Sequence, residues 1–245
     1  MSLGGRLRSG LTYPIESLSD WAVFQEVVVN GAYDSALSRV LENTLEPEFH
    51  VMDLGCNVGF FTLYLIDRLL REEQFNFKIV CVDASEKVLA EATRTFNDQP
   101  LINLTGKVYP LHGLIGLREG EAGFSQQPFH AASTRDETAP PVPYVDLESV
   151  CPAGRLSLIK CDIEGAEVDF IVTYPELLRR THFLLIEWHY RLVNVPHGEK
   201  LLRDLGFTCI EEAKRGSTST ALWMNKAYQS ADPLLVGKTE KEGKK

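Results

Sequence analysis

The segment HVMDLGCNVG, residues 50–59, joins a short apolar run to a turn that contains two glycines. Residues 60–71 are compatible with a helix, and a second apolar run, FKIVCVD, follows at residues 77–83. This spacing is what a strand, a helix and a second parallel strand need for a right-handed crossover. The segment therefore predicts a parallel α/β sheet.

The alternation of apolar strands and amphipathic helices continues along the chain. Further strands are expected at residues 108–115, 156–162 and 183–189, and a closing antiparallel hairpin at 208–213 and 221–225. Helices are expected after the capping residue Ser85, from about residue 166, again from Thr173 with Pro175 behind it, and at 199–205. Uninterrupted apolar strands are typical of a sheet covered on both faces. The pattern predicts an α/β fold with a doubly wound, Rossmann-like, mostly parallel sheet.

A single domain is expected over residues 15–236. Apolar residues at three- and four-residue steps predict an N-terminal helical cap over residues 15–46, interrupted at Gly31. Residues 1–14 are expected to be flexible, and the lysine- and glutamate-rich residues 237–245 to form a disordered tail. Residues 118–143, rich in glycine, proline and polar residues, are either a lid or a disordered insertion.

Composition limits the classes of partner. The 245 residues carry a formal net charge of -9, which would repel nucleic acid. Every apolar run is shorter than the roughly 20 residues that span a bilayer, so no membrane partner is expected. The five cysteines lack metal-binding spacing and the first residues lack an apolar signal core, so we expect reduced thiols and a cytoplasmic location. The oligomeric state is left open, a homodimer included.

Polar residues end the predicted strands at the edge where such sheets bind ligands. Asp53, Gly55 and Gly59 form Asp-x-Gly-x-x-x-Gly, without the three-glycine fingerprint of nicotinamide-binding proteins. A looser loop beside a carboxylate suits a cationic amino acid and its sulfonium, although an ordinary strand-to-helix turn explains the glycines equally well. Asp83 ends the second strand, where a carboxylate accepts hydrogen bonds from ribose hydroxyls; its alternative role is helix capping beside Ser85.

Residues 160–167, KCDIEGAE, place three carboxylates and a lysine at the end of the fourth strand. Such a group is costly unless hydrogen bonds, a cation or a substrate compensates it. Glu164 and Glu167 have an alternative role at the N-terminus of the next helix, whose dipole favours acids. Asp162 and His189, which end neighbouring strands, are candidates for the chemistry, although a lone histidine is more often structural.

Four segments resemble the FkbM-type methyltransferases, a class I family. These segments are residues 51–63, 82–84, 158–167 and 186–189, within a match over about residues 26–189. The resemblance implies a seven-stranded Rossmann-like sheet, S-adenosylmethionine as methyl donor with S-adenosylhomocysteine as product, and usually a hydroxyl acceptor. The acid that many class I enzymes present to adenine is absent after the third strand, so backbone groups at Gly113 and Leu114 are expected to hold the adenine.

Site roles are assigned on this basis. The cofactor-binding residues are expected to be Asp53, Gly55, Asn57, Gly59, Asp83, Ala84, Gly113, Leu114 and Asp162. Asp162 or His189 would remove the acceptor proton, and Glu164 would assist as a third catalytic residue. Glu164 and Glu187 would orient groups in the site or join Asp162 as oxygen ligands of a divalent metal.

A small-molecule or saccharide acceptor is expected. Residues 118–143 and the N-terminal helices are expected to form the walls of its pocket, with Tyr33 and His130 as lining. Three other classes remain open: an N-methyltransferase of the same fold, an NAD-type oxidoreductase, and a non-catalytic protein that binds the nucleoside.

Overall fold

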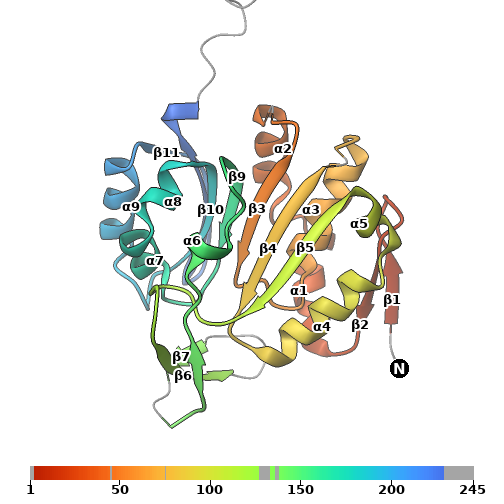
Figure 1. Ribbon diagram of the computed structural model, residues 1–245, viewed down its shortest axis with the longest axis horizontal. Helices are drawn as coiled ribbons and strands as arrows, with labels where there is room; N and C mark the ends of the chain where they lie inside the picture. The colour runs from red at the N-terminus through yellow and green to blue at the C-terminus, as the bar shows by residue number, and fades with distance from the viewer. Residues whose placement is uncertain (1–2, 45, 75, 127–132, 136–137, 229–245) are drawn as a thin grey trace, which may run out of the picture.

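The computed structural model describes residues 3–44, 46–74, 76–126, 133–135 and 138–228. Its centre is a seven-stranded sheet with the order β11-β12-β10-β9-β3-β4-β5, in which β12 is antiparallel to β10 and β11 and the other pairs are parallel (Figure 1). The strands are β3 (Phe49–Leu54), β4 (Phe77–Asp83), β5 (Gly106–His112), β9 (Leu156–Cys161), β10 (Thr181–His189), β11 (Phe207–Arg215) and β12 (Thr218–Asn225). The predicted doubly wound sheet with a C-terminal antiparallel hairpin is confirmed.

Helices cover both faces of this sheet. The first half of the chain forms α1 (Leu18–Phe24), the π-helix η1 (Gln25–Val29), α2 (Asp34–Asn43), α3 (Phe60–Arg71), α4 (Glu86–Asn97) and α5 (Pro100–Thr105). The second half supplies α6 (Leu147–Val150), α7 (Glu167–Thr173), α8 (Pro175–Arg179) and α9 (Val195–Asp204), and the 3₁₀ turn η3 (Lys226–Tyr228) follows the last strand. Figure 1 shows α6–α9 gathered near β10 and β11, and α1–α5 nearer to β3, β4 and β5.

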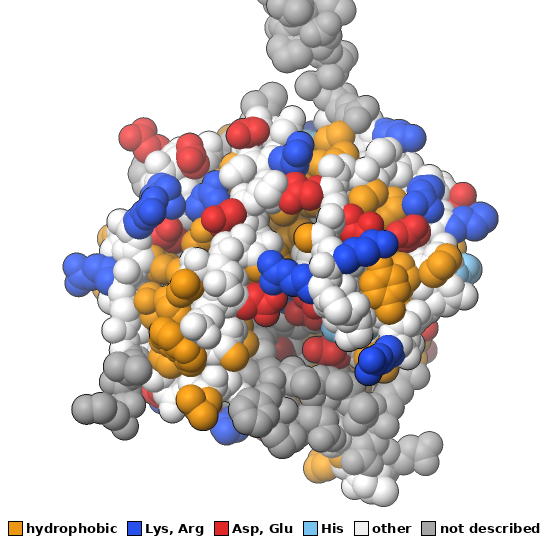
Figure 2. Space-filling model, turned by 180° about the vertical axis from the view of Figure 1, so that it is seen from behind, with side chains coloured by type: hydrophobic (Ala, Val, Ile, Leu, Met, Phe, Trp, Pro, Cys, Tyr) orange, Lys and Arg blue, Asp and Glu red, His pale blue; other side chains and the backbone are white. Residues whose placement is uncertain are grey.

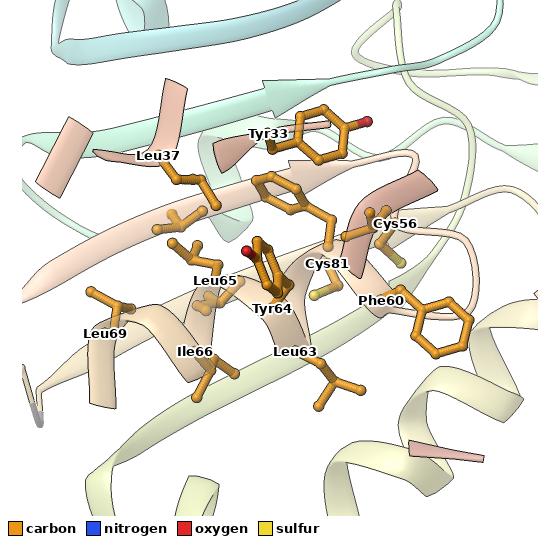
Figure 3. Close-up of a cluster of buried hydrophobic side chains, with 14 of the residues drawn as sticks. Tyr33, Leu37, Cys56, Phe60, Leu63, Tyr64, Leu65, Ile66, Leu69 and Cys81 are labelled. Carbon is orange, nitrogen blue, oxygen red and sulfur yellow. The ribbon is translucent and has the colours of Figure 1, made fainter. Parts of the chain in front are cut away.

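Alternate strand residues pack into two separate core layers. Val51 and Ile79 join the layer formed with α2, α3 and α4, whereas their neighbours Met52 and Val80 join the layer formed with α6–α9. Figure 3 shows part of the first layer, in which side chains of α3 gather with Leu37 of α2 and Cys81 of β4. Because successive side chains of a strand point to opposite faces, a strand covered on both sides must be apolar throughout.

Element boundaries agree closely where the apolar pattern is long. The strand predicted at 77–83 and the helix predicted at 60–71 are found at those residues. The third strand, predicted at 108–115, instead covers Gly106–His112, and α9 begins at Val195 rather than at 199. Ser85 caps α4 as expected, but the N-cap position of α8 is Tyr174, whose side chain makes no capping hydrogen bond, rather than Thr173. The short helices α5 and α6 were not expected.

Residues 3–15, which include most of the segment expected to be flexible, form a hairpin that packs on the core. β1 (Leu3–Arg6) pairs with β2 (Thr12–Ile15) in an antiparallel hairpin. Leu11 is 1% exposed and belongs to the core layer of α3 and α4. The amide of Ser9 donates to the buried Asp67 of α3 at 2.7 Å. Tertiary packing therefore holds a segment whose local sequence favours no regular structure.

The segment predicted as a lid or a disordered insertion contains a small antiparallel sheet. Its strands are β6 (Glu121–Gln126), β7 (Ser133–Arg135) and β8 (Pro141–Pro143), in the order β7-β6-β8. Figure 1 shows β6 and β7 below the ends at which β3, β4 and β5 finish. The tail expected to be disordered, residues 237–245, lies outside the described residues.

Two expectations from composition can be compared with the described residues. The five cysteines, all described, are free thiols. Among the described helices, none combines the length and apolar character needed to cross a bilayer.

Candidate functional site

Three neighbouring strands bring their acidic ends to one edge of the sheet. Asp53 near the end of β3 is in register with Cys81 of β4 and with Lys160 of β9, and Asp83 is the last residue of β4. Asp162 follows β9 directly, and its amide donates to the carbonyl of Leu54 at 3.0 Å. From β3 the chain adds β4 and β5 on one side, and it later returns to add β9 and β10 on the other side. The end of β3 is therefore the point where strand order reverses.

The glycine loop is tied directly to the acid on the next strand. The Asn57 amide donates to Asp83 Oδ2 at 2.8 Å, and the Ser85 amide donates to Asp83 Oδ1 at 2.8 Å. Each carboxylate oxygen can accept two hydrogen bonds, so Asp83 retains capacity for further donors. Burial raises the pKa of Asp83, while the two backbone hydrogen bonds oppose that rise. Asp83 therefore holds the amide of Ser85, the N-cap residue of α4, and fixes the glycine loop at the same time.

The two glycines of the loop are required by packing against the protein itself. Gly55 has φ +75°, and a Cβ there would lie 1.8 Å from the carbonyl oxygen of Asp162. Gly59 has φ +84°, and a Cβ there would lie 2.5 Å from the ring of Phe96. The expected tight turn is present, but the described neighbours, rather than a ligand, leave no room for side chains.

Every amide from residue 55 to residue 59 already has an acceptor. The amides of Gly55 and Cys56 donate to Val82, that of Gly59 to Cys56, and that of Val58 to the side chain of Asn57. With Asn57 bound to Asp83, the loop offers no spare amide to a phosphate. A pyrophosphate site depends on such free amides, and residues 55–59 of the loop supply none.

Lys160 is a buried cation between two of the predicted site acids. Its Nζ donates to the carbonyl of Gly55 at 2.7 Å and lies 3.5 Å from both Asp53 Oδ1 and Asp162 Oδ2. Burial alone lowers the pKa of Lys160, but Asp162 and Asp53 outweigh it and raise the pKa well above its ordinary value. Lys160 therefore stays charged and compensates both carboxylates. Asp53, fully buried and also bound by Thr62 at 2.7 Å, supports the site from inside rather than lining it.

His189 is held between two glutamates. Its Nδ1 lies 2.8 Å from Glu167 Oε1, and its Nε2 lies 3.1 Å from Glu164 Oε2 and 3.9 Å from Asp162 Oδ1. Burial lowers the pKa of His189, but the hydrogen bonds with Glu164 and Glu167 outweigh it and raise the pKa to about 11. A ring that is already protonated cannot remove a proton, so this arrangement does not fit the proposed role of His189 as a base.

A cavity of about 230 Å³ opens beside these groups. Its lining residues are Ala22, Val23, Glu26, Val27, Tyr33, Gly55, Cys56, Asn57, Phe60, Phe61, Lys160, Asp162, Glu164 and Glu187. Four carboxylates against one lysine make the lining acidic, and Figure 2 shows acidic side chains gathered in a hollow on the back of the molecule. Burial and the nearby Asp162 raise the pKa of Glu187 to about 7.

The N-terminal helices form one wall of this cavity. Tyr33 is buried, and its ring packs edge-on against Phe61 with centroids 5.1 Å apart. Figure 3 shows Tyr33, Cys56 and Phe60 at the same end of the cluster. No described residue of 118–143 contributes to the lining, and His130 lies outside the described residues.

The backbone groups predicted to bind adenine are partly occupied by hydrogen bonds within the protein. The Gly113 amide donates to the carbonyl of Asp83 at 3.0 Å, and the Leu114 amide donates to Pro143 at 2.8 Å. The carbonyl of Ala84 lies 3.0 Å from His112 Nε2. The amides of Gly113 and Leu114 therefore hold the strand ends together, which leaves no free N–H at these two residues for a base.

The set of predicted metal ligands needs a correction. Among the described residues, the ligand atoms that converge within 4.8 Å of one another belong to Asp162, Glu164 and His189, and Glu187 is not part of this group. The roles of Lys160 and Glu167 were also missed by sequence reasoning. Their one signal was their presence in the charged segment 160–167.

The comparisons with known proteins show the fold. No protein-family model matches the chain, and no curated protein is similar to it. Magnesium protoporphyrin IX methyltransferase from Synechocystis PCC 6803, solved with bound SAM, is similar with a TM-score of 0.52 and 14% identity, over 86% of this chain and 85% of that one. Methyltransferase FkbM from Methylobacillus flagellatus KT is similar with a TM-score of 0.48 and 13% identity, over 74% of this chain and 44% of that one. The likeness to the first of these two structures supports a shared Rossmann-like fold.

Proposed function

We propose that the protein is an S-adenosylmethionine-dependent methyltransferase. The observation that carries the proposal is the direct hydrogen bond between the glycine loop and the strand-end acid, from the Asn57 amide to Asp83, at the rim of an acidic cavity. The similar fold of a methyltransferase solved with bound SAM supports the same cofactor class.

The residues present fit this cofactor. Asp83 has unused acceptor capacity for ribose hydroxyls. The cavity beside Asn57 is lined by Glu26, Asp162, Glu164 and Glu187, whose charge suits a sulfonium and an ammonium group. At about 230 Å³ the cavity is below the roughly 300–1,000 Å³ of whole ligand pockets, so it would take the methionine end while the nucleoside lies along Asp83.

The proposed acceptor is a hydroxyl of a small molecule or a saccharide. The bound cofactor supplies a methyl carbon activated by the sulfonium, so the protein has to align the acceptor and take its proton. Asp162 is the proposed base, because it lines the cavity and burial raises its pKa, which increases the affinity of the carboxylate for a proton. Lys160 would hold Asp162 Oδ2 and leave Oδ1 turned toward His189.

Binding measurements test the cofactor class. S-adenosylmethionine and S-adenosylhomocysteine should raise the thermal unfolding temperature, because a ligand that binds only the native state stabilises it by mass action. NAD should leave it unchanged, because the loop has no free amide for a pyrophosphate. Stabilisation by NAD alone would contradict the proposal.

A ligand-based control isolates the contact of Asp83. Asp83→Asn should weaken the binding of S-adenosylhomocysteine at least about tenfold, as expected for a hydrogen bond to a charged group. The same substitution should have little effect on the 2′,3′-dideoxy analogue, which lacks both donors. Asp98→Asn, at the exposed end of α4, should bind both ligands as the parent does. Equal losses for both ligands would show that Asp83 acts through the loop and not on the ribose.

The role of Asp162 is tested by rate rather than by affinity. Asp162→Asn should lower the methylation rate about 10²–10⁴-fold, the usual contribution of a positioned base, with little change in cofactor affinity. An unchanged rate would remove Asp162 from the chemistry. Screening hydroxyl and amine acceptors with labelled S-adenosylmethionine distinguishes oxygen from nitrogen methylation.

A further inference from the structure

We propose that Asp162, Glu164 and His189 form a binding site for a divalent transition-metal ion at the wall of the cavity. Two carboxylate oxygens and one imidazole nitrogen are a donor set that suits Mn²⁺, Fe²⁺ or Zn²⁺ better than Mg²⁺, which prefers oxygen ligands alone.

The distances between the ligand atoms of the three side chains are slightly longer than those around a bound metal ion. His189 Nε2 lies 3.1 Å from Glu164 Oε2 and 3.9 Å from Asp162 Oδ1, and all three ligand atoms lie within 4.8 Å of one another. Metal–ligand bonds of about 2.1 Å place neighbouring ligand atoms roughly 3 Å apart and opposite ones roughly 4.2 Å apart. Side-chain rotations of the partly exposed Asp162 and Glu164, which move their oxygens by about half an ångström, would complete the geometry.

The second observation is the set of contacts that orient these ligands from outside. Glu167, which is fully buried, accepts hydrogen bonds from the Gly165 amide at 3.1 Å and is paired with His189 Nδ1 at 2.8 Å. Nε2 is thereby turned toward Glu164 and Asp162. A carboxylate that holds the outer nitrogen of a histidine is the usual partner of a metal-binding imidazole. Lys160 holds Asp162 Oδ2 in the same way and leaves Oδ1 on the side of His189.

Access to the site is open. The side chains of Asp162 and Glu164 are 27% and 28% exposed, and both line the cavity, whereas the His189 side chain is 10% exposed. A cation could therefore enter from the cavity and keep coordination positions for water or a ligand hydroxyl. That last role rests on the proposed function: with the ion present, Asp162 would hold it instead of acting as the base.

The alternative is a salt bridge in which a proton on Nε2 takes the place of the ion. Titration of the chelator-treated protein with Mn²⁺, followed by the electron paramagnetic resonance signal of free Mn²⁺, distinguishes the salt bridge from the metal site. Mn²⁺ is the chosen probe because Zn²⁺ also binds the free thiols of this chain. We expect one saturable site per chain, with Mg²⁺ competing weakly.

Matched variants locate the site. Glu164→Gln should weaken Mn²⁺ binding at least about tenfold, and Glu167→Gln about 10–100-fold, the usual effect of losing the outer partner of a ligand. Glu164 is partly exposed, so its variant is expected to fold if Glu167→Gln does not. His50→Gln removes a different histidine–glutamate pair, with Glu48, and should bind as the parent does.

The outcomes separate this site from the proposed function. Absence of saturable binding, an unchanged affinity in Glu164→Gln, or an equal loss in His50→Gln would overturn the metal site. Binding of S-adenosylhomocysteine is measured on the metal-free protein. If it binds while Mn²⁺ does not, only the metal site fails; if Mn²⁺ binds while it does not, only the methyltransferase function fails.

Discussion

Replacement of Lys160 by methionine tests whether the site acids depend on one buried cation. The Lys160 side chain is 6% exposed and Asp53 is fully buried, and Asp53 Oδ1 has no hydrogen-bond partner, only the ammonium group 3.5 Å away. Removing one member of a buried ion pair costs about 3–5 kcal/mol, because the other charge stays buried without compensation. A chain of this size loses roughly 2–4 °C of melting temperature per kcal/mol, so Lys160→Met should melt about 6–20 °C lower.

Equilibrium urea unfolding gives the free energy, and two further variants make the result specific. Lys160→Met combined with Asp53→Asn should recover at least about 1 kcal/mol of the loss, because the stranded charge is then gone. Lys78→Met is the matched surface control: Lys78 is paired with Glu48 but is 41% exposed, and its loss should cost at most about 1 kcal/mol. A cost below about 1 kcal/mol for Lys160→Met, or strictly additive effects in the double variant, would refute the reasoning.

Three other substitutions test the packing that holds the site. Gly55→Ala should prevent stable folding because its Cβ would overlap the Asp162 carbonyl, whereas Gly216→Ala, also at positive φ but with no atom within 4 Å, should cost only about 1–2 kcal/mol in urea unfolding. Similar costs would contradict the overlap. Thr62→Val should cost about 1.5–3 kcal/mol, since it removes a hydrogen bond to the buried Asp53 carboxylate; a neutral result would mean that the carboxylate is satisfied otherwise. Tyr174→Phe should cost about 1–3 kcal/mol by thermal unfolding, because the buried Tyr174 hydroxyl donates to the Leu117 carbonyl at 2.9 Å and accepts from the Leu147 amide. An unchanged stability would show that water replaces the hydroxyl group.

The sequence alone determined the sheet, its helical layers and the edge at which the acids meet. Residues 77–83 are apolar except for Lys78 and the final Asp83, a pattern typical of a strand buried on both faces that ends in a polar residue. Because the carboxyl ends of parallel strands share one edge, Asp83 and Asp162 could be placed near a common site without coordinates. The N-terminal hairpin had no such local signal, since it is held by contacts with Asp67 and the core.

Tertiary structure alone decided what each polar group of the site does. The register of β3 against β9 puts Lys160 beside Asp53, and the pairing of residues 22 positions apart puts His189 on Glu167. The same contacts raise the pKa of His189, and Asp53 is bound by Thr62 in the interior rather than at the cavity wall. The periodicity of a sequence fixes which face or edge of the sheet a residue occupies. The partners of a charged side chain depend instead on distances between strands that are remote in the chain. Those distances set the protonation of the side chain and its function.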